Sequence, residues 1–219
     1  MHAELDRELV VGHPVTYADR QRLPYVEAVL LEAMRLAPVV ALALPHFTAV
    51  DVNISTSDGD QLTIPAGSLV IANLWSVGRD PDVWSDEADT FRPERFLRRR
   101  SGTDHAATTS ASTSSCPFAV NTNDDELDLN SDGSTRDDGS GSCSLVVDGR
   151  LAESIYPFSF GARRCVGESL GRLQIFVFFA NIMRSCRLLQ VNDSPPSSDG
   201  ETYGDVIRPA PYKIRILPR

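Results

Sequence analysis

A stretch rich in Ser, Thr and Asp at residues 101–144 divides the chain into two parts, which must build any fold together. These 44 residues hold 16 Ser or Thr, eight Asp or Glu, and one Lys or Arg, which gives a net charge of −7. A segment so poor in apolar side chains cannot bury enough surface to offset the entropy that it loses on ordering. We therefore predict a disordered insert at 98–152, between ordered parts at 1–97 and 153–219.

Most of the chain's net charge of −9 belongs to this insert. The other residues hold 22 acidic and 20 basic side chains, so the ordered parts are almost neutral. Nucleic-acid binding needs a basic face, so we expect no nucleic-acid partner. Four cysteines in 219 residues are too few for a disulfide scaffold. No apolar run reaches the roughly 18 residues that would span a membrane.

The ordered parts predict a mainly α-helical fold with small antiparallel β-sheets. Apolar residues recur at helical spacing from Tyr25 to Leu36, where Pro24 suits a first turn and Pro38 ends the helix. A long apolar helix is predicted at 165–186. Short strands are predicted at 50–54, 61–64, 68–73, 188–191 and 212–217.

The strongest chemical signal is the sequence FSFGARRCVG, which ends at Gly167. Its cysteine, Cys165, follows an irregular loop and stands at the predicted start of a helix, where free N–H groups and the helix dipole favour a thiolate. Gly161 and Gly167 let the backbone approach a bulky group. Phe158 supplies an apolar wall, and Arg163 adds positive charge. A thiolate in such a loop suits haem iron as its proximal ligand.

Three other interpretations of this cysteine explain less. A phosphatase-type nucleophile needs an arginine six residues later, but Gly171 stands there and Arg172 comes one position late. A zinc site needs paired ligands, whereas the four cysteines lie more than 20 residues apart without a CxxC pair. A buried structural cysteine is common, but it leaves two glycines and an arginine at fixed offsets unexplained.

The pattern FxxGxRxCxG resembles the haem-ligand signature of the cytochrome P450 family. Further matches follow in the family's order. Glu32-Ala-Met-Arg35 resembles its ExxR helix, and Phe91-Arg-Pro-Glu-Arg-Phe96 resembles its PERF segment. Pro45-His46 and Ile64-Pro-Ala-Gly67 resemble the strand elements between them.

The resemblance covers nearly all of residues 1–97 and 153–219 and implies the C-terminal part of the P450 fold. The helix after the cysteine is most similar to those of animal microsomal members. Two features depart from the family pattern. Gly171 stands where the family usually has Ala, and the insert is far longer than the usual link.

The resemblance also implies roles for single residues. Cys165 would be the axial thiolate ligand of the haem iron and the catalytic centre. Arg163 would pair with a haem propionate, because guanidinium binds carboxylate bidentately. His46 matches a position that often reaches the other propionate, although a surface histidine explains it equally well. Phe158 would pack beside the ligand loop and tune the iron.

Glu32, Arg35 and Arg95 would form a buried ion triad that braces the cysteine loop. Helical i, i+3 spacing places Glu32 and Arg35 on one face. Taken alone, that spacing equally fits an exposed helical salt bridge, and the PERF match favours the triad. Residues 40–44 would line an apolar substrate pocket.

For the whole protein, the resemblance implies a haem-thiolate monooxygenase. It would insert one oxygen atom of O₂ into a small lipophilic substrate, with electrons from NADPH through a reductase partner. It would lie on the cytosolic face of the endoplasmic reticulum membrane, held by an N-terminal anchor. This chain lacks the anchor and the oxygen-activating central helix, so we expect a C-terminal fragment that is inactive alone. The alternative is a truncated, non-catalytic remnant that binds haem or a partner.

Overall fold

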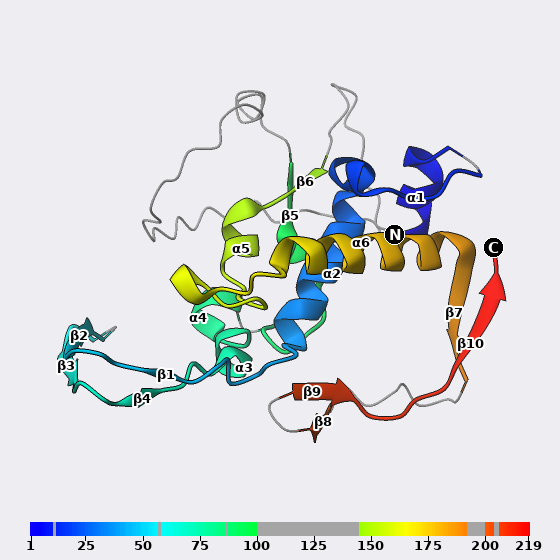
Figure 1. Cartoon of the computed structure of the whole chain (residues 1–219). Coiled ribbons are helices and arrows are strands. Elements are labelled where there is room, and N and C mark those ends of the chain that lie inside the picture. The colour runs from blue at the N-terminus through cyan, green and yellow to red at the C-terminus, as the bar shows by residue number, and fades with distance from the viewer. Residues whose placement is uncertain (11, 57, 86, 100–144, 192–199, 204–205) are drawn as a thin grey trace.

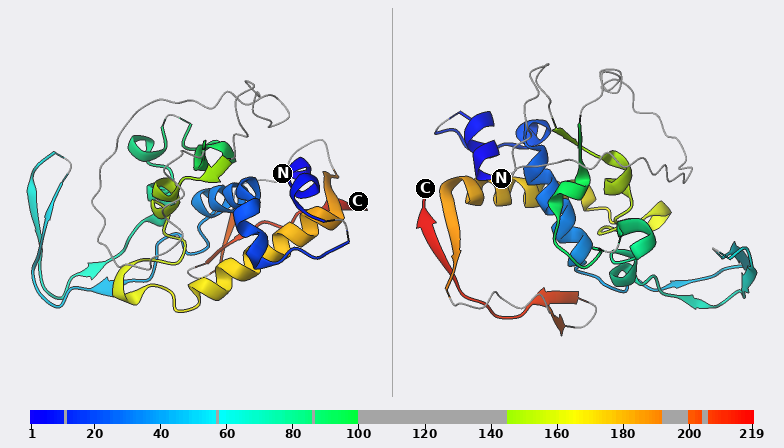
Figure 2. Two further views of the ribbon diagram at one scale, coloured as in Figure 1. Left: turned by 90° about the horizontal axis from the view of Figure 1, so that it is seen from above. Right: turned by 180° about the vertical axis from the view of Figure 1, so that it is seen from behind.

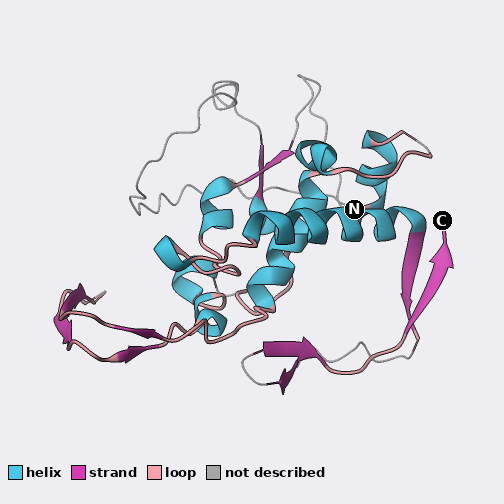
Figure 3. Cartoon of the chain, in the orientation of Figure 1, coloured by secondary structure: helices cyan, strands magenta, loops and turns pink. Residues whose placement is uncertain are grey.

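The computed structural model describes residues 1–10, 12–56, 58–85, 87–99, 145–191, 200–203 and 206–219. Helices form a central body, and long two-stranded ribbons extend from it (Figures 1 and 3). The helices are α1 (His2–Glu8), η1 (Tyr17–Arg22), α2 (Pro24–Leu36), α3 (Leu74–Val77), α4 (Pro81–Trp84), η2 (Pro93–Phe96), α5 (Gly149–Glu153), η4 (Gly161–Arg163) and α6 (Glu168–Ser185). The predicted fold class, mainly helical with small antiparallel sheets, is confirmed.

Within the described residues, every sheet is an antiparallel pair of strands. The pairs are β1 (His46–Phe47) with β4 (Leu69–Val70), β2 (Val52–Ser55) with β3 (Gln61–Ile64), β5 (Leu97–Arg99) with β6 (Leu145–Val147), β7 (Cys186–Gln190) with β10 (Ile214–Pro218), and β8 (Gly200–Tyr203) with β9 (Val206–Pro209). The strands predicted at 50–54 and 61–64 pair with each other, with Val52 opposite Ile64. The two C-terminal strands also pair, with Cys186 opposite Pro218.

Helix α2 is the centre of the body because both of its sides are buried. It begins at Pro24. The N–H groups of a first helical turn have no partner within the helix, so proline, which has no N–H, is well tolerated there. It ends at Leu36, since Pro38 disfavours the helical conformation of the residue before it. The predicted helix at 25–36 is therefore confirmed.

Two apolar clusters flank α2. The first joins it to α1 and α6 through Leu5, Leu9, Val15, Leu23, Val26, Leu30, Phe176, Ala180 and Met183. The second joins its opposite side to residues 84–97 and 155 through Ala28, Leu31, Trp84, Ala88, Phe96, Leu97 and Ile155. Polar residues of α2 that lie between these clusters are thereby excluded from water.

Helix α6 begins three residues later than predicted. Gly167 precedes its first residue, Glu168, whereas the sequence predicted a start at Cys165. The amide of Cys165 is directed back into the preceding loop and donates to the carbonyl of Phe158 at 2.8 Å. The backbone is still extended at Arg164, with φ −60° and ψ 158°, so Cys165 lies just before the helix and not in its first turn. No helix in the described part of the chain is long and apolar enough to cross a lipid bilayer.

The two ends of the chain lie close together (Figure 2). Arg219 forms an ion pair with Asp6 of α1, and its backbone N–H donates to the carbonyl of Ser185 at 2.9 Å. The guanidinium of Arg219 also reaches the carbonyls of Met183 and Arg184. These bonds satisfy carbonyl groups that the end of α6 leaves without helical partners.

The two ends of the region 98–152, which the sequence predicts as an insert, contain regular elements in the described residues. Strands β5 and β6 pair from Leu97 opposite Val147 to Arg99 opposite Leu145, and α5 follows at once. Their apolar side chains pack on the second cluster, which gives these flanking residues a reason to order. The disorder predicted for residues 100–144 lies outside the described residues.

Candidate functional site

The cysteine loop, residues 154–167, joins α5 to α6 and presents the thiol of Cys165. The Cys165 N–H donates to the Phe158 carbonyl at 2.8 Å, and the Arg164 N–H donates to the Gly161 carbonyl at 3.3 Å. Gly161 has φ +71°, a left-handed conformation that strongly favours glycine. Hydrogen bonds between its own backbone groups therefore hold the loop from Phe158 to Cys165 in a closed turn. The Cys165 side chain is exposed and forms no disulfide.

Side chains at the start of α6 support Phe158. The guanidinium of Arg172 lies over its half-buried ring, with 5.2 Å between Cζ and the ring centroid. Arg172 is held by Glu168, with 2.9 Å between Nε and the carboxylate. Glu168 and Arg172 are not among the site residues predicted from the sequence. Their i, i+4 spacing, from the first residue of the helix into its second turn, was the signal that could have found them.

The two predicted propionate partners lie in different parts of the structure. Arg163 is exposed in η4, two residues before Cys165 and on the same loop. His46 is exposed on β1, and its Nδ1 lies 2.7 Å from the carbonyl of Leu44. The ribbon formed by β1 and β4 leaves the body near α3, away from α6 (Figure 1). The structure thus places Arg163 beside the predicted ligand and His46 on a separate ribbon.

Glu32, Arg35 and Arg95 meet as an ion triad beside α2. The Glu32 carboxylate accepts from Arg35 at 2.7 and 2.8 Å and from Arg95 Nε at 3.1 Å. The side chains of Glu32 and Arg35 are fully buried, and that of Arg95 is 9% exposed. The predicted alternative, an exposed helical salt bridge, does not describe this geometry.

The pKa of the Glu32 carboxyl reflects two opposing effects. Burial alone would raise it, because the charged form loses its hydration. Hydrogen bonds from the Arg35 guanidinium and the Arg92 N–H oppose this, together with the positive charges of Arg35 and Arg95. The result is a pKa below the usual value of 4.5. Glu32 is therefore a stable buried anion.

The triad is bound to the segment at residues 78–95. Arg35 donates to the carbonyls of Gly78, Ala88 and Thr90, and the Ala88 contact measures 2.6 Å. Arg95 donates to the carbonyls of Trp84, Glu87 and Thr90. The direct hydrogen bonds of the triad therefore fasten this segment to α2. The bracing of the cysteine loop by the triad stays a prediction.

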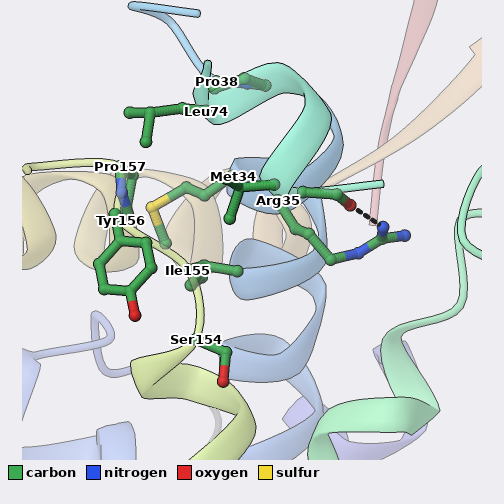
Figure 4. A pocket seen from close by; sticks show the side chains of 10 residues that line it. Met34, Arg35, Pro38, Leu74, Ser154, Ile155, Tyr156 and Pro157 are labelled. Atoms are coloured by element: carbon green, nitrogen blue, oxygen red, sulfur yellow. Dashed lines mark hydrogen bonds between the residues drawn. The ribbon is translucent and has the colours of Figure 1, made fainter. Parts of the chain in front are cut away.

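A shallow hollow lies where α2 meets the cysteine loop (Figure 4). Met34 comes from α2, next to Arg35, while Ile155 and Tyr156 come from the first residues of the loop. The remaining lining residues are Pro38, Leu74, Val77, Gly78, Ser154 and Pro157. Arg35 of the triad also lines this hollow, so the triad and the first residues of the cysteine loop border the same space.

A second polar cluster, not predicted from the sequence, holds the other end of α2. Glu4 of α1 accepts the N–H groups of Tyr25 and Val26 at 2.9 and 3.0 Å. The Tyr25 hydroxyl donates to Glu94 of the PERF segment at 2.7 Å. Burial, followed by the hydrogen bond to Glu94, raises the pKa of Tyr25 to about 12. No local pattern links residues 4, 25 and 94, so sequence alone gave no signal.

Comparison with protein-family models gives a match to the family described as Cytochrome P450, over residues 1–120 and 146–216. The chain belongs to the cytochrome P450 family. Cytochrome P450 2U1 of Bos taurus is 29% identical over 219 residues, which are 100% of this chain and 31% of that protein. The steroid 17-alpha-hydroxylase/17,20 lyase of Oryzias latipes is 31% identical over 217 residues, which are 99% of this chain and 32% of that protein.

The solved structure of a zebra fish cytochrome P450 with progesterone matches with a TM-score of 0.67 at 26% identity. The match covers 99% of this chain and 38% of that one. The predicted fold, part of the P450 fold, and the predicted likeness to animal microsomal members are confirmed. The chain spans about a third of the length of the curated cytochrome P450 relatives that it matches.

The family implies haem, and the residues of the cysteine loop fit that group. Cys165 offers one exposed, unpaired thiol, the donor that a thiolate-ligated iron needs. Gly167 lies beside the sulfur, since a Cβ on it would be 3.7 Å from the Cys165 Sγ, an ordinary van der Waals contact. Arg163 adds an exposed guanidinium that suits a carboxylate.

Proposed function

We propose that the chain is the haem-ligand part of a monooxygenase that inserts one oxygen atom of O₂ into an organic substrate. The observation that carries this proposal is the free, exposed thiol of Cys165 on a loop closed by the bond to Phe158. When bound, haem supplies the redox-active iron at which O₂ is activated. Cys165 would hold that iron as a thiolate.

The other residues of the loop would orient the cofactor. Arg163 would pair with one propionate, and the ring of Phe158 would shield the sulfur from water on one side. Gly161 and Gly167 would allow the backbone to approach the macrocycle. His46 would need to reach the second propionate from its own ribbon, where its ring now bonds to Leu44. The triad of Glu32, Arg35 and Arg95 would fix the body on which the loop rests.

The proposal extends to partners. The solved zebra fish structure contains progesterone, and a small lipophilic substrate of this kind is our proposal for the present chain. Electrons would come from NADPH through a reductase, for which the exposed Arg164 beside Cys165 offers positive charge. We place the whole protein on the cytosolic face of the endoplasmic reticulum membrane, by analogy with its relatives.

The proposal is tested by loading the full chain with haem, reducing it, and recording the absorption of its carbon monoxide complex. We expect the absorption band of thiolate-ligated iron in the wild type. The substitution Cys165→Ser removes the donor sulfur, so the band disappears. Cys186→Ser is the matched control because it changes the other described cysteine, at the start of β7, and the band remains. Equal bands in the two variants would reject Cys165 as the ligand.

A further inference from the structure

The Cys165 sulfur and the ring of Phe158 lie along the same side of α6. A Cβ on Gly167 would be 3.7 Å from the sulfur, and a Cβ on Gly171 would be 3.1 and 3.2 Å from Cε1 and Cζ of the ring. The two glycines are one helical turn apart, and the Gly171 N–H donates to the Gly167 carbonyl at 2.8 Å. The far end of the ring therefore meets α6 one turn beyond the sulfur.

Arg172 covers a face of the same ring. Its Cζ lies 5.2 Å from the ring centroid, which is within the range of a cation–π contact. Its Nε forms an ion pair of 2.9 Å with Glu168, so a carboxylate of the same helix holds the guanidinium in place. The Phe158 ring thus has α6 at its far end and a fixed cation over its face.

A second arginine has the same spacing from Glu168 but a different geometry. Arg164 precedes Glu168 by four residues, yet its Nη1 lies 3.7 Å from the carboxylate and its side chain is 68% exposed. Arg172 follows Glu168 by four residues, and its side chain is only 25% exposed. Because the spacing is the same, it does not explain the shorter and more buried pair. The contact with the Phe158 ring is what distinguishes Arg172.

The backbone of Phe158 holds the amide of Cys165. The Cys165 N–H donates to the Phe158 carbonyl at 2.8 Å. The next residue, Ser159, has φ +62°, a conformation that side chains rarely adopt, so the turn that carries this carbonyl tolerates few other backbone shapes. The ring contacts of Phe158 and the place of the Cys165 amide are therefore joined in one residue.

We propose that Arg172, held by Glu168, is a positioning residue that fixes the ring of Phe158 and, through the Phe158 carbonyl, the amide of Cys165. The consequence for haem rests on the proposed function, because Cys165 must be the iron ligand for its position to matter there. The geometric part concerns only residues of this chain, so it is tested without haem.

The first test is amide hydrogen exchange in the full chain without haem. Loss of a cation–π contact changes an equilibrium by about two- to fivefold, so Arg172→Leu should speed exchange of the Cys165 amide by that factor. The Phe176 amide, in the middle of α6, should exchange at the wild-type rate. Arg172→Lys keeps a cation and should restore most of the protection. Arg184→Leu is the matched control, because it removes an arginine from the last turn of α6, and it should leave Cys165 exchange unchanged.

A second substitution shows whether Arg172 acts through the ring. Phe158→Leu removes the ring, so adding Arg172→Leu to it should change Cys165 exchange no further. The same acceleration with and without the ring would overturn the proposal, and so would an unchanged rate in Arg172→Leu. An equal acceleration at Phe176 would also overturn it, because that is the sign of a general loss of stability.

In the haem-loaded chain, Arg172→Leu should lose part of the thiolate-type carbon monoxide band, whereas Arg172→Lys and Arg184→Leu should keep it. A full band in Arg172→Leu would overturn the role of Arg172 in placing the ligand. If the wild type lacks that band but Cys165 exchange still responds to Arg172→Leu, the proposed function fails and the positioning role of Arg172 stands.

Discussion

The key side chains of this structure differ in their exposure to water. Cys165 is presented to solvent with its thiol free, whereas Glu32 and Arg35 are buried completely. A buried charge is tolerated only where other groups replace the water it has lost. Glu32 meets that need through Arg35, Arg95 and the Arg92 N–H. The contribution of Glu32 to the stability of the fold therefore depends on all of these hydrogen-bond partners.

The first prediction at this scale concerns the loss of the Glu32 charge. In Glu32→Gln, Arg35 remains buried without its anion, so the free energy of unfolding should fall by about 3–5 kcal/mol in urea titrations. Glu87→Gln is the control, because Glu87 forms an exposed ion pair with Arg92 and should lose about 1 kcal/mol or less. Similar losses in both variants would contradict the account of the triad.

The second prediction concerns pH. Because the pKa of Glu32 is lowered in the folded state, its contribution to stability is complete above the usual value of 4.5. The contribution is lost as the pH falls through the lower folded-state pKa, where Glu32 takes up a proton. The difference in stability between wild type and Glu32→Gln should therefore shrink steadily below pH 4.5 in urea titrations. A difference that stays constant down to pH 3 would show that the charge is not responsible.

At the scale of elements, α2 is held at both ends by residues from outside it. Glu4 of α1 supplies the acceptor for the free N–H groups of its first turn, and Arg35 ties its last turn to residues 78–90. Burial raises the pKa of Glu4, although the hydrogen bonds from Tyr25 and Val26 act in the opposite direction. The N-terminal cap of α2 therefore comes from a residue that is distant in sequence.

This cap predicts a moderate effect for one substitution. Glu4→Ala leaves two N–H groups of α2 without their acceptor, so the chain should lose about 0.5–2 kcal/mol of unfolding free energy. Glu153→Ala, at an exposed position of α5, is the control and should change stability by less than about 0.5 kcal/mol. Urea titration followed by circular dichroism measures the free energy of unfolding of both variants. A Glu4→Ala variant as stable as the wild type would show that α2 needs no cap from α1.

The elements also show what sequence could predict. The bounds of α2 follow from local signals, the apolar spacing and the prolines at 24 and 38. The meeting of Glu32, Arg35 and Arg95 followed from motif resemblance. The start of α6 lies three residues later than predicted because the backbone of the cysteine loop is still extended at Arg164. The carbonyl partners of the triad in residues 78–95 are backbone atoms, which no sequence pattern marks.

At the scale of the whole molecule, much apolar surface faces solvent. On α6, Leu170 is 60% exposed, Phe178 66% and Ile182 48%. On the β1 ribbon, Phe47 is 74% exposed. Large contiguous apolar surfaces are rare on soluble monomers and mark sites of association. The helical body therefore has buried interfaces around α2 and an uncovered face on α6.

This surface predicts how the 219-residue chain behaves alone. It should bind the dye ANS and form soluble oligomers in size-exclusion chromatography, because association covers the apolar face. The double substitution Phe178→Asp, Ile182→Asp should lower both effects, whereas Val83→Asp, on α4 and away from α6, should leave them nearly unchanged. A monomer that binds no dye would contradict the exposure of α6.

The central claim is that the sulfur of Cys165 holds the iron of a bound haem. The most direct measurement is X-ray absorption at the iron edge of the haem-loaded chain, which counts sulfur neighbours of the metal. We predict one sulfur neighbour in the wild type and in Cys186→Ser, and none in Cys165→Ser. A sulfur neighbour that persists in Cys165→Ser, or a wild type whose iron has only nitrogen and oxygen neighbours, would contradict the assignment.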